Sequence, residues 1–282
     1  MKPPLVLHIG AHKTGTTAIQ NRLAASKAPD LRYVVVTGPA RPMMLNDAPD
    51  PAAIAALREA VPLPDDPATL TVISFEGFAG HYRTGYTNAG AAAHATAEAF
   101  SAYDTRVVVY LRRQDRVIES MVRQLVKTDP GERLDTYLAG LGPDSYSWLN
   151  LLNAWSEAFG ADRILPRIYD RAALAAEGGV FADFCRTIAR PDLSENTPDP
   201  ESNPSYTAAA VELAQMCGPH LPESHWPRLR SALEAWSARP EQRAADKSLI
   251  EPGVRDALLA RYAESNEQVR ARWFPDRAAL FD

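Results

Sequence analysis

The chain has 282 residues, 46% of them hydrophobic, and a formal net charge of −5 at pH 7. This is ordinary for a globular protein with a sizeable core, in one large domain or two small ones. Because the net charge is negative, the chain as a whole does not attract nucleic acid, and any anion-binding site has to be a local cluster of basic groups. Cys185 and Cys217 lie far apart without metal-ligand spacing, and we expect buried free thiols in a reducing compartment.

Segments that could cross a membrane or direct secretion are not found in the sequence. The first apolar run, Leu5 to Ile9, is too short for a signal peptide or a transmembrane helix, and no later run reaches the necessary length. We therefore expect a cytoplasmic protein with no transmembrane segment.

The first elements in chain order are a strand, a polar loop and a helix. The apolar run Leu5 to Ile9 predicts the strand, and Gly10 opens the loop. A helix is predicted from Thr16, with Ile19 and Leu23 on one face. A loop between a strand and a helix N-terminus is a geometry that binds phosphate.

The composition of this loop also suits an anion. Gly10 and Gly15 let the backbone turn tightly and approach the ligand closely. Lys13 adds a mobile positive charge, and Thr16 and Thr17 add hydroxyl groups at the start of the helix. The loop therefore predicts a phosphate site.

The order of residues departs from the nucleoside-triphosphate pattern, in which lysine directly follows the second glycine. Here the order is Lys13-Thr14-Gly15-Thr16-Thr17, which resembles the K-[ST]-G-T-[TS] loop of sulfotransferases that use 3′-phosphoadenosine-5′-phosphosulfate (PAPS). The resemblance implies that these five residues cradle the 5′-phosphosulfate of PAPS. His12 lies in the same loop, where it either touches the sulfuryl group or packs the loop.

Strands and helices alternate along the next part of the chain. The predicted strands are Tyr33–Thr37, Thr69–Phe75, Arg106–Leu111 and Arg163–Tyr169, the last demoted towards a sheet edge by Pro166. The predicted helices are Ala52–Ala60, Ala89–Tyr103, Gln114–Lys127, Trp148–Phe159, Val180–Ile188, Tyr206–Met216, Trp226–Ala238 and Val254–Trp273, with loops at Pro39–Asp50 and Pro191–Pro204.

This alternation predicts an α/β fold: a three-layer, P-loop-type, mostly parallel sheet flanked by helices. We expect a single domain over residues 1–282, in which residues 170–282 are a mainly helical extension packed on the sheet. Ligands of such sheets bind at the carboxyl ends of the strands.

A second anion site is predicted where the fourth strand ends. Arg112 follows Leu111, and Ser120 comes eight residues after Arg112. Arginine offers a planar fork for phosphate oxygens, and a serine hydroxyl on the next helix can add a hydrogen bond. The PAPS-dependent sulfotransferases carry an arginine and a serine at this spacing on the 3′-phosphate, so the resemblance gives Arg112 and Ser120 that role. Arg113 is the alternative if the register is shifted by one.

Sulfuryl transfer to a hydroxyl needs the leaving phosphate neutralised and the acceptor deprotonated. Lys13 suits the first role. Glu76 ends the third strand, in the region where members of the family place a glutamate or histidine as base, and His81 is the alternative base. The resemblance implies PAPS as cosubstrate. No metal-ligand constellation is visible in the sequence, so we expect no metal requirement.

Two other functions remain open from the sequence. One is a Mg-dependent P-loop kinase acting on a small molecule, and the other is a nucleotide-binding module that has lost catalysis. The acceptor is expected to be a hydroxyl-bearing small molecule or glycan, with carbohydrate preferred. The segments Thr37–Asp50, Gly77–Ala89 and Thr128–Trp148, which mix aromatic residues and arginines, would shape its pocket.

Overall fold

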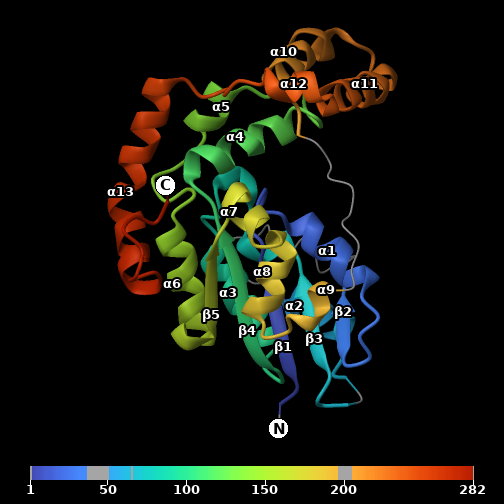
Figure 1. Cartoon of the computed structure of the whole chain (residues 1–282), viewed down its shortest axis with the longest axis vertical. Coiled ribbons are helices and arrows are strands. Elements are labelled where there is room, and N and C mark those ends of the chain that lie inside the picture. Colours follow the sequence, from blue (N-terminus) through green and yellow to red (C-terminus); the bar gives the residue numbers. More distant parts are fainter. Residues whose placement is uncertain (1, 37–50, 65, 196–204, 282) are drawn as a thin grey trace. The chain divides into compact units, whose positions relative to one another are not determined.

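A computed structural model of the chain describes residues 2–36, 51–64, 66–195 and 205–281 (Figure 1). These residues divide into two compact units. Unit 1 comprises residues 1–112, 142–200 and 264–282, and unit 2 comprises residues 113–141 and 201–263. The predicted loop over 39–50 lies outside the described residues. The expectation of a single domain stays a prediction.

Unit 1 contains the sheet. Its strands are β1 (Pro4–His8), β2 (Leu31–Val34), β3 (Leu70–Ser74), β4 (Asp104–Leu111) and β5 (Ile164–Ile168). In the described residues these strands pair in parallel, in the order β2-β3-β1-β4-β5. The α/β fold predicted from the sequence is confirmed, and β5, which contains Pro166, is an edge strand as predicted.

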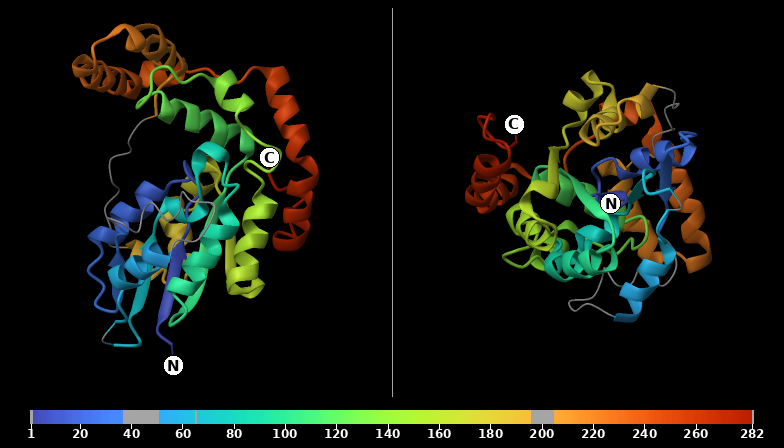
Figure 2. Two further views of the ribbon diagram at one scale, coloured as in Figure 1. Left: turned by 180° about the vertical axis from the view of Figure 1, so that it is seen from behind. Right: turned by 90° about the horizontal axis from the view of Figure 1, so that it is seen from below.

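Helices cover both faces of this sheet. On one face, α1 (Thr16–Ala25), α8 (Gly179–Thr187) and α9 (Asp192–Glu195) enclose a core that includes Val6, Val72 and Val108. Figure 1 shows α8 in front of the sheet, and the view from behind in Figure 2 shows α3 and α6 on the other face. The remaining helical elements of unit 1 are α2 (Pro51–Ala60), η3 (Glu76–Ala79), η4 (Tyr82–Thr84), α3 (Ala89–Ala99), α6 (Trp148–Phe159), η5 (Ala161–Arg163) and α7 (Arg171–Ala176).

Unit 2 is helical in its described residues. Its elements are α4 (Gln114–Leu125), α5 (Leu134–Ala139), α10 (Ala208–Cys217), η6 (Gly218–His220), η7 (Glu223–His225), α11 (Trp226–Ala238) and α12 (Pro240–Ala244). The last helix, α13 (Pro252–Trp273), begins in unit 2 and ends in unit 1.

Caps explain where several helices begin. The Ser147 hydroxyl accepts a hydrogen bond from the Asn150 amide at the start of α6. The Asp170 carboxylate accepts from two amides at the start of α7, a short helix that the apolar pattern did not reveal. Such caps satisfy amides that lack partners within the helix.

Three expectations differ from the structure. The loop predicted over Pro191–Pro204 contains the helix α9 at Asp192–Glu195, and residues 196–204 lie outside the described ones. The β-branched run predicts a strand over Tyr33–Thr37, but β2 covers Leu31–Val34, where its pairing with β3 ends at Val34–Ile73. Residue 37 lies outside the described residues. Cys185 is buried as expected, whereas the expectation for Cys217 was wrong, because Cys217 ends α10 on an exposed position.

Candidate functional site

The candidate site lies at the carboxyl ends of β1, β3 and β4. These strands are neighbours, with His8 of β1 opposite Ser74 of β3 and Val108 of β4. The chain crosses from one side of β1 to the other between β3 and β4, and such switch points open the ligand crevice of parallel sheets. The loop after β1, Glu76 after β3 and Arg112 after β4 therefore meet at one edge.

The loop between β1 and α1 has a tightly turned backbone. Lys13 has φ 67° and Gly15 has φ 84°, both in the left-handed region, and Gly15 stands at the N-cap of α1. The Thr14 hydroxyl donates to the Ala11 carbonyl at 2.5 Å and closes the turn. A left-handed lysine is strained, and such strain concentrates at functional sites.

Gly10 and Thr16 give the loop the features of an anion-binding site. A Cβ at Gly10 would lie 2.6 Å from the Thr16 hydroxyl oxygen, so a larger residue would crowd that group. The Thr16 hydroxyl is buried and has no hydrogen-bond partner in the described part of the chain. Thr17 is exposed in the first turn of α1. Buried polar groups normally have partners, so Thr16 is suited to a bound ligand.

Arg112 is brought to this loop. Its Nη1 donates to the Lys13 carbonyl at 2.9 Å, and its Cζ lies 5.5 Å from the centre of the Tyr169 ring. The Trp148 indole N–H donates to the Arg112 carbonyl at 2.9 Å. Sequence reasoning missed Tyr169, although it directly follows β5 and the rule about strand ends would have found it.

Arg113, the alternative to Arg112, lies in a different environment. Its Nε donates to the Asp115 carboxylate at 2.8 Å within unit 2. Ser120 is half-buried on α4, also in unit 2. The role of Ser120 on a 3′-phosphate therefore stays a prediction, while Arg112 is the arginine that contacts the loop.

Glu76 opens η3 directly beyond β3, and its side chain is 34% exposed. Burial raises the pKa of the Glu76 carboxyl above its ordinary value, while the nearby Thr16 hydroxyl and Lys13 ammonium act in the opposite direction. A carboxylate in this position is a stronger base than a solvated one, with Lys13 and Thr16 beside it.

His12 lies between this carboxylate and a tyrosine. Its Nε2 is 3.8 Å from Oε2 of Glu76, and its backbone N–H donates to the Tyr86 hydroxyl at 2.8 Å. Burial, followed by the charges of Lys13 and His81, lowers the pKa of His12 to about 4. His12 is therefore a neutral imidazole near pH 7. Tyr86 is a site residue that sequence reasoning placed only among candidate acceptor contacts.

His81, the alternative base, has a local structural role. Its Nδ1 accepts from the Arg83 amide at 3.1 Å and caps η4, and its own amide donates to the Asn88 side chain at 2.8 Å. One ring nitrogen of His81 is thus engaged with the backbone. Glu76 is the better placed of the two candidate bases, because it lies beside both His12 and Thr16.

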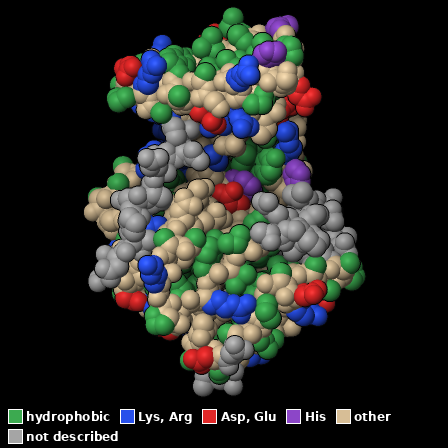
Figure 3. Space-filling view, turned by 90° about the vertical axis from the view of Figure 1, so that its right-hand side faces the viewer, with side chains coloured by type: hydrophobic (Ala, Val, Ile, Leu, Met, Phe, Trp, Pro, Cys, Tyr) green, Lys and Arg blue, Asp and Glu red, His purple; other side chains and the backbone are tan. Residues whose placement is uncertain are grey.

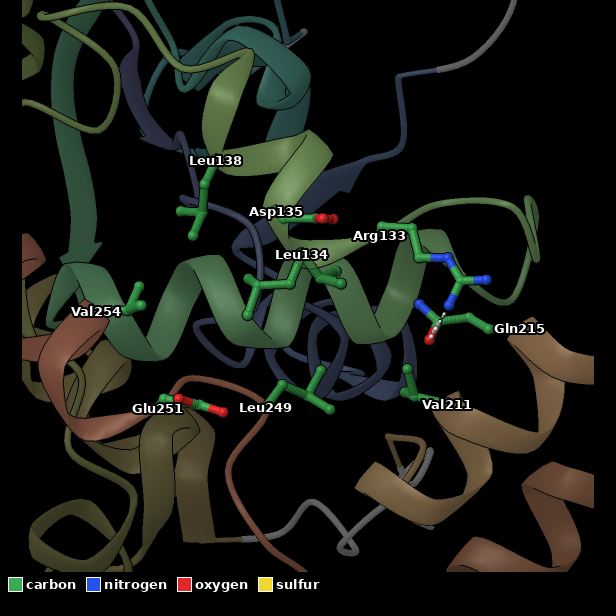
Figure 4. Close-up of a pocket in the computed structure, with 10 residues that line it drawn as sticks. Arg133, Leu134, Asp135, Leu138, Val211, Gln215, Leu249, Glu251 and Val254 are labelled. Carbon is green, nitrogen blue, oxygen red and sulfur yellow. Dashed lines mark hydrogen bonds between the residues drawn. The ribbon is translucent and has the colours of Figure 1, made fainter.

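The residues expected to shape an acceptor pocket separate between the units. Tyr82, Tyr86, Tyr146 and Trp148 belong to unit 1, while Arg41 lies outside the described residues. Arg133 lines a cavity of ≈ 360 Å³ within unit 2. Figure 4 shows Arg133 beside Gln215 at one end of this cavity, and the aliphatic residues that line it are Val122, Leu134, Leu138, Val211, Leu249 and Val254.

Charge is mixed over the visible surface. Figure 3 shows Lys and Arg side chains lying among Asp and Glu side chains on one face of the molecule.

In the described ranges, His, Cys, Asp and Glu form no group of three that could hold a metal ion. Within the same ranges, no helix combines the length and apolar composition needed to span a membrane.

Comparison with known proteins supports the fold. No protein-family model matches the chain. An uncharacterized protein of Archaeoglobus fulgidus is 26% identical over 175 residues, which cover 60% of this chain and 46% of that protein, so the chain spans about half the length of this curated relative. The crystal structure of a sulfotransferase from Alicyclobacillus acidocaldarius superposes with a TM-score of 0.54 and 13% identity, covering 97% of this chain and 96% of that one. The chain therefore has a sulfotransferase-type α/β fold.

Proposed function

We propose that the protein is a PAPS-dependent sulfotransferase, which moves a sulfuryl group to a hydroxyl of an acceptor. One observation carries the proposal: the Arg112 guanidinium donates a hydrogen bond to the Lys13 carbonyl in the loop after β1. This contact lies at the same edge of the sheet as Glu76. The site thus combines two cationic side chains with a candidate base. Such a set suits a nucleotide with phosphates at both its 3′ and 5′ positions.

The residues present fit this nucleotide. The Thr16 hydroxyl, buried and without a hydrogen-bond partner among the described residues, and the close approach at Gly10 suit the 5′-phosphosulfate at the N-terminus of α1. His12, Thr14, Gly15 and Thr17 would complete the loop contacts. Arg112, with Ser120, would hold the 3′-phosphate.

The chemistry assigned to the side chains follows from their positions. Lys13 neutralises the charge that develops on the leaving phosphate, and Glu76 accepts the proton of the acceptor hydroxyl as that oxygen bonds to sulfur. The bond between sulfur and the bridging phosphate oxygen breaks, and adenosine 3′,5′-bisphosphate leaves. No metal ion is assigned a role. The acceptor is a hydroxyl-bearing small molecule or glycan, with carbohydrate preferred.

Calorimetric titration tests the nucleotide class. We expect micromolar binding of adenosine 3′,5′-bisphosphate without metal and no binding of ATP with Mg²⁺, and Arg112→Ala should weaken the bisphosphate interaction. Metal-dependent ATP binding without bisphosphate binding would instead indicate a kinase. Bisphosphate binding without turnover on any acceptor hydroxyl would indicate a nucleotide-binding module that has lost catalysis.

A further inference from the structure

Tyr86 is a buried residue on the segment between η4 and α3. Its hydroxyl lies 3.2 Å from Nδ1 of His12 in addition to accepting the His12 backbone N–H at 2.8 Å. The opposite ring nitrogen, Nε2, faces the Glu76 carboxylate at 3.8 Å. Tyr86, His12 and Glu76 thus form a row that comes from three different parts of unit 1.

We propose that Tyr86 and His12 form a proton-ordered chain that holds the Glu76 carboxylate in position for base catalysis. In this chain the Tyr86 hydroxyl donates to Nδ1 of His12, and the Nε2–H of His12 points at Glu76. Tyr86 and His12 are positioning residues, since neither is assigned contact with the reacting atoms in this role. The role rests on the proposed function, because it takes Glu76 as the base.

The direction of the hydrogen bonds follows from the acceptor at one end. An ionised carboxylate can only accept, so the imidazole nitrogen that faces Glu76 carries the proton. A neutral imidazole has one N–H, so Nδ1 is then an acceptor, and the Tyr86 hydroxyl is the donor placed to meet it. The lowered pKa of His12, about 4, supports a neutral ring. The charged or titratable neighbours of this ring are Glu76, Lys13, His81, Tyr82 and Tyr86.

The backbone holds both partners in unusual conformations. Tyr86 has φ 68°, an outlier for a bulky residue, and Lys13, directly after His12, has φ 67°. The Tyr86 amide donates to the His81 carbonyl at 3.0 Å, and the Tyr86 ring stacks on Trp148 at 6.1 Å between centroids. Trp148 in turn donates to the Arg112 carbonyl. The surroundings therefore fix the Tyr86 hydroxyl opposite His12 at a cost in backbone strain.

Such a chain would act on the rate and not on nucleotide affinity. The separation of 3.8 Å is longer than a hydrogen bond, and contacts of this kind tighten when a substrate completes the site. In the proposed chain, the Nε2–H of His12 holds one oxygen of Glu76 and leaves the other to accept the proton of the acceptor hydroxyl. A small misplacement of a base costs up to about 100-fold in rate.

Nitrogen NMR of the histidine rings tests the chain without any assay of turnover. We expect wild-type His12 to be the neutral Nε2–H tautomer at pH 7, and Tyr86→Phe to shift its ring nitrogens, with Tyr103→Phe as control. Tyr103 is another buried tyrosine of unit 1, whose hydroxyl donates to the Pro62 carbonyl. A wild-type Nδ1–H tautomer, or a ring unchanged by Tyr86→Phe, would overturn the proposal. This readout holds even if the nucleotide is not PAPS.

Paired substitutions of His12 test the positioning role in catalysis. The amide nitrogen of glutamine reaches the place of Nε2, whereas that of asparagine reaches only the place of Nδ1. We expect the kcat of His12→Asn to lie about 10- to 100-fold below that of His12→Gln, while the two variants bind the bisphosphate with equal affinity because both change the same loop contact. Equal kcat values for the two variants would contradict the proposal. Loss of bisphosphate binding by the wild type would instead point to failure of the proposed function.

Discussion

Charged and polar groups are arranged differently in the two units. In unit 1, at the strand edge, the Thr16 hydroxyl is buried with no hydrogen-bond partner in the part of the chain that the structure describes, and Lys13 has a strained backbone. In unit 2, Arg123 is also buried, but its guanidinium has several hydrogen-bond partners. Its guanidinium donates to the Glu119 and Asp246 carboxylates and to the carbonyls of Tyr206 and Lys247, at 2.6–3.2 Å.

This difference separates two uses of buried polarity. A fully satisfied network fixes chain segments that are distant in sequence, as Arg123 does for α4 and the segments around residues 206 and 246. Strained and unsatisfied groups lower stability and are retained where a ligand completes them. Substitutions in unit 2 should therefore affect unfolding, and substitutions at the strand edge should affect binding or rate.

The largest expected effect is on stability, from Arg123→Ala. This change leaves Glu119 buried without its cation and should lower the free energy of unfolding by about 3–5 kcal/mol. Urea denaturation measures the loss. The control is Arg116→Ala on the same helix, since the Arg116 side chain is 54% exposed and should contribute less than about 1 kcal/mol. Similar losses for the two variants would remove the contrast between the units.

Lys13→Ala should lower turnover by about 10²- to 10³-fold, because the charge on the leaving phosphate loses its cation. Bisphosphate affinity should fall much less, and the free energy of unfolding should be nearly unchanged. Steady-state rates with calorimetry separate these quantities, with exposed Lys27→Ala as the control. Full turnover in Lys13→Ala would exclude this lysine from the chemistry.

Glu76→Gln should reduce turnover by about 10²-fold or more with intact nucleotide affinity, since the amide has the shape of the carboxylate but cannot take a proton. In the wild type, burial raises the pKa of Glu76, so the rate should fall with decreasing pH at a pH above the usual range of a glutamate. A pH–rate profile measures this acid limb. An unchanged rate in Glu76→Gln, combined with a loss in His81→Gln, would transfer the role of base to His81.

The smallest effect is expected from Arg112→Ala, which should weaken bisphosphate binding by about 10-fold, the value of a charged hydrogen bond. Arg113→Ala sharpens the comparison, because Arg113 is paired with Asp115 in unit 2 and should affect affinity less. Calorimetric titration of both variants with the bisphosphate decides whether Arg112 or Arg113 binds the 3′-phosphate. A larger loss in Arg113→Ala would make Arg113 the phosphate ligand.

The sequence predicted the sheet well because its buried strands are continuous apolar runs. The apolar run at β4 predicted a strand of a parallel sheet, and Pro166 was enough to place β5 at the edge. Short elements such as α5 and α7 escaped prediction, since six residues are too few to display a helical period. The end of β2 depended on its neighbour, which local sequence does not contain.

The site residues that could be predicted are those that come shortly after the end of a strand. Lys13, Glu76 and Arg112 each follow a strand directly or through the loop, and the structure brings them to one edge. The contact between Tyr86 and His12 was not predictable, because 74 residues separate the partners and the left-handed backbone of Tyr86 has no sequence signature. Long-range pairing of this kind is decided by tertiary packing alone.

The two cysteines provide a natural reporter of opening. Cys185 lies in the core between α1 and α8, where burial raises the pKa of its thiol to about 12, and Cys217 is exposed. A thiol reagent at neutral pH should modify one site per chain in the native protein, and a second site only when unit 1 opens. The rate of that second modification would measure how often the sheet and its covering helices separate under native conditions.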